Sequence, residues 1–420
     1  MAGFFCSAEN FRTERFYISM PPSNSFLPYG RHFVDKEDLA AIAKVFDSGF
    51  LTTGQVVSDF EDAFSAKTGA EHAVVCSSGT AALHLAAMAL KLGEGDVAIV
   101  PSITFLATAN ALRMVGVEVV FSDVDPNTGL MRPEDLLNAI LRADTNKLKA
   151  VFPVHYAGQS PHMEEISSIA RENGLFIVED ACHALGSTYG KSETFKVGSC
   201  RHSDLAIFSF HPVKHIAMGE GGAVCTNDQY LAKRVELLRN HGMVRDPSGF
   251  TNKQFAFSSD GNANPWYYEM HELGYNYRAS DIHCALGLSQ LKKFSSFSKA
   301  RKNLASHYDA LFKNAGPYIR PLARCEGSSP VWHLYVLLIE FEEYGITRDA
   351  LMKELKSKNI GTQVHYIPLH QQPYYRNRYG DVELPGASRF YERCLSIPLF
   401  PAMGIQDIEY VVNTIKSILN

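Results

Sequence analysis

Short apolar runs alternate with longer segments of helical periodicity between about residues 70 and 240. Apolar runs bounded by turn residues are typical of buried strands, and apolar positions three and four apart are typical of helices. The predicted strands cover residues 73–76, 96–101, 117–125, 148–154, 175–180, 204–210 and 222–227. The predicted helices cover residues 79–92, 105–116, 131–143, 162–174 and 228–240. Because strands and helices alternate, we expect an α/β domain with a mostly parallel sheet.

The pattern changes after a long helical stretch over residues 280–312. A strand is predicted over residues 332–341, a helix over 347–359 and another strand over 361–368, which together indicate a smaller α+β domain. The predicted organisation is an N-terminal extension (1–25), a large α/β domain (26–280), and a small C-terminal α+β domain with its linking helix (281–420). Residues 244–270 are rich in turn residues and are predicted to form a long functional loop.

Composition narrows the class of protein. The 420 residues include 40 Lys and Arg against 45 Asp and Glu, and 46% are hydrophobic. This share excludes disorder as the main state, and no apolar run reaches the ~18 residues that a membrane span needs. Without a basic block or zinc-finger pattern, we expect no nucleic-acid partner. The eight cysteines and sixteen histidines are dispersed, so we expect reduced thiols, no metal site and a cytoplasmic protein.

Three segments carry candidate chemistry. Residues 77–85, SSGTAALHL, place a Ser-Gly-Thr turn before a helix, whose first N–H groups can bind an anion. Asp180 ends an apolar strand, and Lys214 lies in a turn-rich segment between two others. Each has a simpler interpretation. The Ser-Gly-Thr segment could be a plain turn, Asp180 a helix cap or part of an ion pair, and Lys214 a surface lysine. Together they are what pyridoxal phosphate needs: a phosphate cradle, a carboxylate for the ring nitrogen and a Schiff-base lysine.

The chain resembles the DegT/DnrJ/EryC1/StrS family of sugar aminotransferases, which has the fold type I architecture of aspartate aminotransferase. The resemblance covers residues 26–420 and is carried by segments that match in order and spacing. These segments include PYGRHFVDKED, CSSGTAALHLA, PSITFLATANA, DACHALGS, FSFHPVKHIAMGEGG and LGYNYRASDIHCALGLSQL. A lysine stands where some relatives have a histidine and lose amino transfer, which favours a transaminase.

The resemblance implies a catalytic role for Lys214, which would form the Schiff base with pyridoxal 5′-phosphate and then move a proton during transfer. Asp180 would pair with the pyridinium nitrogen. Phe105 would stack on the cofactor ring, and His183, three residues after Asp180, would lie against the ring or its hydroxyl. From the residues alone, Phe105 suits a core position and His183 a structural one.

Phosphate binding is also implied by the resemblance. Gly79 and Thr80 would bind the phosphate, and Ser209, five residues before Lys214, would give its hydroxyl. Asn276, in the NYR segment, would reach the phosphate of a neighbouring subunit. This implies a homodimer with shared active sites, although an ordinary loop asparagine is the simpler interpretation of Asn276.

Within the family, the chain is most similar to the UDP-4-amino-4,6-dideoxy-N-acetyl-β-L-altrosamine transaminases of pseudaminic acid biosynthesis, through segments such as PVHYAGQS and QVHYIPLHQQPYY. This implies amino transfer from L-glutamate to C4 of a UDP-linked 4-keto-6-deoxy-N-acetylhexosamine. One alternative is another nucleotide-linked ketosugar, aminated at C3 or carried by GDP or dTDP. A second is a catalytically silent regulator or scaffold that binds the cofactor, which the intact lysine and carboxylate disfavour.

Candidate substrate contacts come from two segments. His365 and Tyr366, in QVHYIP, are candidates from the small domain, and Tyr29 and Arg31 are candidates near the start of the matching region. An arginine can bind a diphosphate with two parallel hydrogen bonds. A surface or interface position explains each of the four equally well. The extension over residues 1–25 and the loop over residues 244–270 depart from the family pattern.

Overall fold

The computed structural model describes residues 26–191 and 194–419, so the predicted N-terminal extension lies outside the described residues. A seven-stranded sheet has the order β1-β9-β8-β5-β4-β2-β3. Its strands are β1 (His72–Cys76), β2 (Val97–Pro101), β3 (Glu118–Ser122), β4 (Leu148–Val151), β5 (Phe176–Asp180), β8 (Leu205–Ser209) and β9 (Gly222–Thr226). Only β9 runs antiparallel to its neighbours. The predicted strands and the mostly parallel sheet are confirmed.

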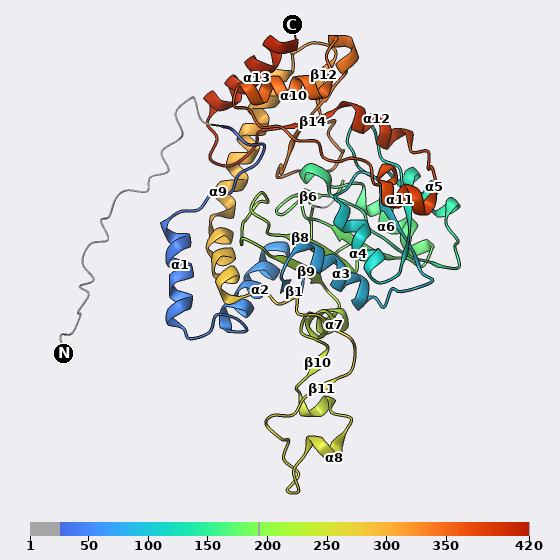
Figure 1. The fold of residues 1–420 in the computed structure, drawn as a ribbon, viewed down its shortest axis with the longest axis vertical. Coiled ribbons are helices and arrows are strands. Elements are labelled where there is room, and N and C mark those ends of the chain that lie inside the picture. Colours follow the sequence, from blue (N-terminus) through green and yellow to red (C-terminus); the bar gives the residue numbers. More distant parts are fainter. Residues whose placement is uncertain (1–25, 192–193, 420) are drawn as a thin grey trace, which may run out of the picture.

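Helices cover both faces of this sheet (Figure 1). They include α3 (Gly79–Ala89), α4 (Leu106–Met114), α5 (Pro133–Arg142), α6 (Met163–Glu172) and α7 (Gln229–Arg239). Successive side chains of β1 enter different cores: Val74 belongs to one hydrophobic cluster and Val75 to the other. This alternation is the period of two that a strand imposes, and it explains why the central strands are apolar throughout.

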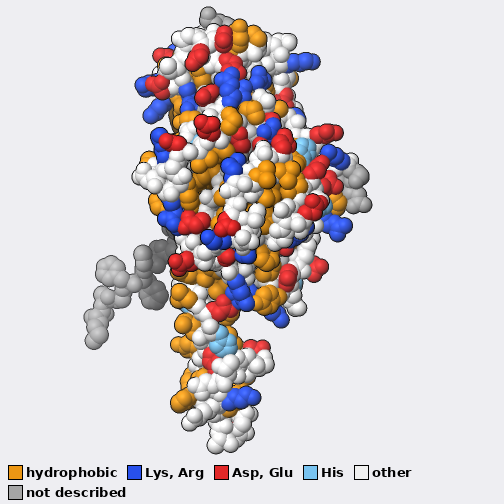
Figure 2. Space-filling model, turned by 90° about the vertical axis from the view of Figure 1, so that its right-hand side faces the viewer, with side chains coloured by type: hydrophobic (Ala, Val, Ile, Leu, Met, Phe, Trp, Pro, Cys, Tyr) orange, Lys and Arg blue, Asp and Glu red, His pale blue; other side chains and the backbone are white. Residues whose placement is uncertain are grey.

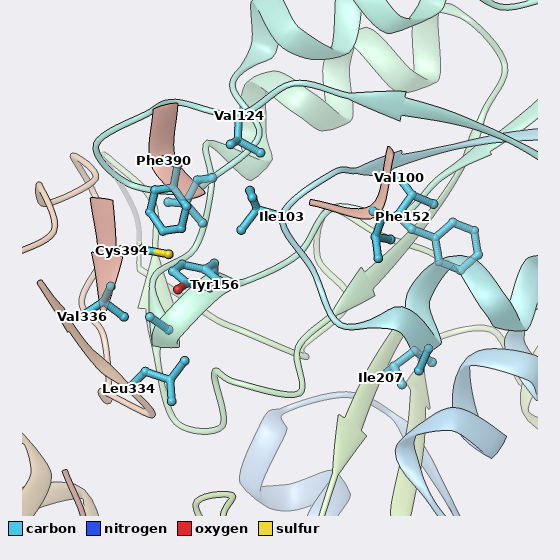
Figure 3. Packing of buried hydrophobic residues seen from close by; sticks show 14 of the residues in the cluster. Val100, Ile103, Val124, Phe152, Tyr156, Ile207, Leu334, Val336, Phe390 and Cys394 are labelled. Carbon is cyan, nitrogen blue, oxygen red and sulfur yellow. The ribbon is translucent and has the colours of Figure 1, made fainter. Parts of the chain in front are cut away.

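The second half of the chain builds a three-stranded antiparallel sheet from β12 (Ile319–Pro321), β13 (Tyr335–Ile339) and β14 (Cys394–Ile397). This part of the chain also contains three helices: the long helix α9 (Asp281–Phe312), α10 (Arg348–Ser357) and α13 (Ile405–Leu419). One hydrophobic cluster runs from the large sheet into this part, as Figure 3 shows for Tyr156 beside Phe390 and Cys394. The α+β pattern is as predicted, and the domain boundary at residue 280 stays a prediction.

The strand predicted over residues 361–368 is wrong. This segment pairs with β14 through a single bridge between Gln363 and Ser396. The Tyr156 hydroxyl donates to the His365 carbonyl at 2.5 Å, so the backbone bonds to a side chain rather than to a strand. Pro368 also lacks the N–H that a longer ladder needs.

Further helices and strands complete the described part of the chain. They are α1 (Lys36–Asp47), α2 (Gln55–Thr68), β6 (Thr188–Tyr189), β7 (Phe195–Lys196), β10 (Met243–Val244), α8 (Lys253–Ala256), β11 (Glu269–Met270), α11 (Pro373–Tyr379) and α12 (Pro385–Arg393). Residues 243–273, called the arm below, project from the body beyond α7 (Figure 1). Among the described helices, none combines the length and apolar character needed to cross a membrane.

Candidate active site

A cavity of about 470 Å³ lies beyond the carboxyl ends of β5 and β8, where ligands bind in parallel α/β sheets. The predicted site residues that line it are Tyr29, Gly79, Thr80, Phe105, Asp180, His183, Ser209, Lys214, His365 and Tyr366. Two predicted residues do not. Arg31 is exposed outside the lining, and Asn276 pairs with Asn240 at the base of the arm. The resemblance had assigned Asn276 to a neighbouring subunit's site, and that assignment stays a prediction.

Asp180 ends β5 and is nearly buried. One carboxylate oxygen accepts a hydrogen bond from the Thr108 hydroxyl at 2.7 Å, and the other accepts from the Cys182 N–H at 3.2 Å. Both donors are neutral, so they fix the carboxylate without cancelling its charge. The carboxylate is therefore available to a cationic group in the cavity. Thr108 was not among the predicted site residues. Its position in the first turn of the helix that follows Phe105 could have indicated that it lies near the site.

Lys214 lies in the same cavity as Asp180. Desolvation by burial lowers the pKa of its ammonium group, and the negative charge of Asp180 opposes that shift only in part. A lower pKa leaves more of the amine unprotonated, which is the form that attacks a carbonyl carbon. The surface-lysine interpretation is therefore wrong, because Lys214 is half-buried and lines the cavity.

The amino end of α3 forms an anion cradle. Ser78 caps the helix, its hydroxyl accepting from the Ala81 N–H at 3.1 Å. The N–H groups of Gly79 and Thr80, in the first turn, have no partner four residues back within the helix. A Cβ on Gly79 would lie 2.8 Å from the Cβ of Ser209, so only glycine lets that serine approach. The space at this helix end is therefore suited to phosphate, because free backbone N–H groups, the helix dipole and the Ser209 hydroxyl all favour an anion there.

Aromatic side chains also line the cavity. Phe105 is 54% exposed, which rules out the core interpretation and offers a ring face to the cavity. The Tyr366 hydroxyl lies 3.0 Å from Nε2 of His183, and the His183 and His333 rings are 4.4 Å apart. Burial lowers the pKa of His183, so the imidazole is neutral. His333 also lines the cavity but was not among the predicted site residues, because no motif in its segment of the sequence pointed to the site.

These residues fit pyridoxal phosphate. Lys214 would supply an amine, Asp180 an acceptor for a protonated ring nitrogen, Phe105 a ring face, and Gly79 with Ser209 a phosphate cradle; all five line the cavity. When bound, this cofactor supplies an electron sink for the carbon next to the transferred nitrogen. The residues of the chain would orient the group and hold the proton on its ring nitrogen.

The fold and this site define the class of pyridoxal-phosphate-dependent aminotransferases of fold type I, as predicted. The chain belongs to the DegT/DnrJ/EryC1/StrS aminotransferase family, whose profile matches residues 33–416. It is 38% identical over 399 residues to the spore coat polysaccharide biosynthesis protein SpsC of Bacillus subtilis, covering 94% of this chain and 98% of that one.

Solved structures agree with the family. Helicobacter pylori PseC, an aminotransferase involved in the biosynthesis of pseudoaminic acid, matches with a TM-score of 0.83 and 30% identity, covering 94% of this chain and 99% of that one. The sugar aminotransferase Spr1654 of Streptococcus pneumoniae in its pyridoxal phosphate form matches with a TM-score of 0.82 and 28% identity, covering 94% and 98%. The protein is a pyridoxal-phosphate-dependent sugar aminotransferase.

Proposed function

We propose that this enzyme transfers an amino group from L-glutamate to C4 of a UDP-linked 4-keto-6-deoxy-N-acetylhexosamine, in pseudaminic acid biosynthesis. Amino transfer rests on one observation above all: a half-buried lysine shares its cavity with a carboxylate and a helix N-terminus. The likeness to PseC over 94% of the chain supports the sugar and the pathway. The cytoplasmic location stays a prediction.

The proposed catalytic residue is Lys214. Its Nζ would hold the cofactor, and its amine would take the proton from the α-carbon of glutamate and return it during the second half of the exchange. Asp180, fixed by Thr108, would hold the proton on the ring nitrogen of the cofactor, which would keep the ring able to accept electrons. The lowered pKa of Lys214 suits this role, because a general base must be unprotonated to act.

The remaining cofactor contacts follow from the cavity. We assign the phosphate to Gly79, Thr80 and Ser209, and the ring faces to Phe105 and His183. The ring centroids of Phe105 and Tyr366 are 5.9 Å apart, and Tyr366 in turn bonds to His183, so these side chains hold one another in place.

The proposed sugar contacts are Tyr29, His365 and Tyr366, which line the cavity. The Tyr29 and His365 rings are 5.2 Å apart, and His365 is oriented by a 2.8 Å hydrogen bond to Ser396. Arg31 stands outside the lining, so we assign it only to the outer, diphosphate part of the substrate.

A different nucleotide-linked ketosugar is the second candidate. The observation that favours it is the likeness to SpsC, whose 38% identity exceeds the 30% identity with PseC.

The deciding experiment incubates the cofactor-loaded enzyme with L-glutamate and a panel of UDP- and GDP-linked 4-ketosugars, followed by NMR of the products. We expect amination at C4 of the UDP-linked altrosamine precursor. Activity on another ketosugar alone refutes the specific proposal.

Lys214→Ala should abolish turnover and borohydride labelling of the protein, whereas Lys36→Ala, which changes an exposed lysine on α1, should change neither. Wild-type turnover by Lys214→Ala would refute the assigned catalytic lysine.

We also propose a homodimer. Large apolar side chains on and after α1 are exposed, including Phe46 at 61% and Phe50 at 64%, and exposed apolar patches of this kind mark interfaces. Sedimentation equilibrium should give twice the chain mass, and a monomer at micromolar concentration would contradict the proposal.

A further inference from the structure

The turn that carries Lys214 has few hydrogen bonds of its own. It spans residues 211–217, between β8 and β9, and within it the Lys214 N–H donates to the His211 carbonyl at 2.8 Å. The next backbone bond runs from the Met218 N–H to the Phe210 carbonyl, at 2.9 Å. The N–H groups of the three residues between Lys214 and Met218 donate to no backbone carbonyl of the described chain. Local backbone bonding therefore does not by itself fix the direction of the Lys214 side chain.

The side chain of His215, the residue after Lys214, ties this turn to a distant segment. Its Nε2 lies 2.9 Å from the Val331 carbonyl oxygen. A carbonyl oxygen can only accept, so Nε2 carries the ring proton and donates it. Burial, together with the positive charge of Arg301, lowers the pKa of His215 to about 3, so the imidazole is neutral. Within the part of the chain that the structure describes, no other side chain of residues 211–217 makes a hydrogen bond.

Val331 is a firm anchor for that hydrogen bond. It is 1% exposed, and its N–H donates to the Ser187 hydroxyl at 2.9 Å. Its carbonyl oxygen is closely packed, because a Cβ added to Gly158 would lie only 2.5 Å from it. The His215 ring also packs near Phe294 of α9, with the ring centroids 6.4 Å apart. Because the backbone at Val331 is held in this way, the position of the His215 ring is set from outside the lysine turn.

The segment that begins at Val331 also reaches the cavity. His333, two residues later, lines the cavity, and its ring lies 5.7 Å from that of His215 and 4.4 Å from that of His183. All three histidines are interior, each at most 5% exposed, and histidine takes up little of the surface drawn in Figure 2. Residues 331–333 therefore connect the lysine turn to His183, which we have assigned to a face of the cofactor ring.

We propose that His215 is a positioning residue for Lys214: its hydrogen bond to the Val331 carbonyl holds the turn so that Nζ of Lys214 meets the aldehyde carbon of pyridoxal phosphate. In that step the unprotonated amine attacks the aldehyde and a C=N bond forms to Nζ, while the aldehyde oxygen leaves as water with both amine hydrogens. His215 itself is not among the described residues that line the cavity, so it acts through Lys214. The inference rests on the proposed role of Lys214.

The test separates capture of the aldehyde from binding of the cofactor. His215→Phe keeps a planar ring but removes the donor, whereas His215→Gln places an amide N–H donor near the position of Nε2. Each cofactor-free variant is mixed with pyridoxal phosphate, and the rate of Schiff-base formation is followed by absorbance. Each is also titrated calorimetrically with pyridoxamine phosphate, which carries an amine in place of the aldehyde and cannot condense with Lys214.

We expect His215→Phe to slow the capture of pyridoxal phosphate about 10- to 100-fold, because the reacting atoms are no longer held in the right geometry. Its affinity for pyridoxamine phosphate should be unchanged, since that ligand uses the cavity but forms no bond to Lys214. His215→Gln should recover most of the lost rate. The control is His202→Phe, which removes a histidine that bonds to the Tyr189 hydroxyl at 3.1 Å outside the cavity lining and should change neither measurement.

Capture by His215→Phe at the wild-type rate would overturn the assignment, and so would equal losses in capture and in pyridoxamine phosphate affinity, which indicate a structural role alone. If thermal unfolding shows that His215→Phe does not fold, His215→Asn replaces it, because its shorter amide does not reach the Val331 carbonyl. Capture by His215→Asn as fast as by His215→Gln would then overturn the assignment. Failure of the proposed function gives a different result, since borohydride would fix the cofactor of the wild-type protein on a residue other than Lys214.

Discussion

Gly79→Ala tests the anion cradle. The new Cβ would lie 2.8 Å from the Cβ of Ser209 and 3.2 Å from its hydroxyl oxygen, closer than ordinary contact. Ser209 has little room to retreat, because it pairs with Gly222 in the sheet. Gly222 is itself tightly packed, because a Cβ added to it would lie only 2.3 Å from the Ser78 carbonyl oxygen. Forcing a methyl group into such packing costs about 1–3 kcal/mol.

The cost should appear in cofactor binding, because relief of the clash displaces the N–H groups or the hydroxyl that hold the phosphate. A loss of about 1–3 kcal/mol corresponds to roughly 5- to 150-fold weaker binding. The assay is titration of the cofactor-free protein with pyridoxal phosphate, followed by absorbance, together with thermal unfolding. Gly93→Ala is the control, since the nearest atom to its Cβ would be the Val115 carbonyl oxygen at 3.9 Å. Equal affinity of Gly79→Ala and the control would refute the cradle.

Three further predictions concern other parts of the chain. Burial lowers the pKa of Lys214 below its ordinary 10.5, so just below pH 10.5 the unfolded chain binds more protons than the folded one and the stability of the cofactor-free protein rises with pH. Lys214→Met should remove this rise in urea unfolding measured at a series of pH values below 10.5. An unchanged slope would contradict the burial. Tyr366→Phe should leave His183 short of a buried partner and cost about 1–3 kcal/mol in urea unfolding; no loss would show that their 3.0 Å contact is not stabilising. Glu269 accepts the Thr251 N–H, so Glu269→Gln should speed hydrogen exchange in the arm and leave exchange in the body unchanged. The control is Asp260→Asn, which changes an exposed carboxylate of the arm. Unchanged exchange in the arm of Glu269→Gln would contradict the role of Glu269 in fixing the shape of the arm.

The large sheet was predictable because its strands are short apolar runs whose two faces are both buried. The proximity of Asp180 and Ser209 was also predictable. Each ends a strand, and neighbouring parallel strands end at the same edge of a sheet. Helix α2 was missed although it carries a signal: Phe60 and Phe64 are four residues apart, and Gly69 ends it with a left-handed φ of 85°.

The wrong strand over residues 361–368 has a physical reason. Its apolar and aromatic residues suit a strand, but His365 is buried at the cavity and the Tyr366 hydroxyl contacts His183 across it, so tertiary contacts override the local preference. Contacts of this kind join segments far apart in the chain, and local periodicity carries no information about them. The exposed aromatic side chains of the arm, such as Trp266 (73% exposed), were likewise beyond prediction, because the turn-rich sequence does not show which of its aromatic residues are buried.

The measurement that bears most directly on the proposed function follows the transferred nitrogen itself. The loaded enzyme is incubated with ¹⁵N-labelled L-glutamate and the UDP-linked 4-keto-6-deoxy-N-acetylhexosamine, and the sugar product is examined by NMR. The proposed function predicts ¹⁵N bonded to C4 in the wild-type product and none with Lys214→Ala. Label that enters a different ring carbon, or a sugar that stays unlabelled while the cofactor is bound, would contradict it.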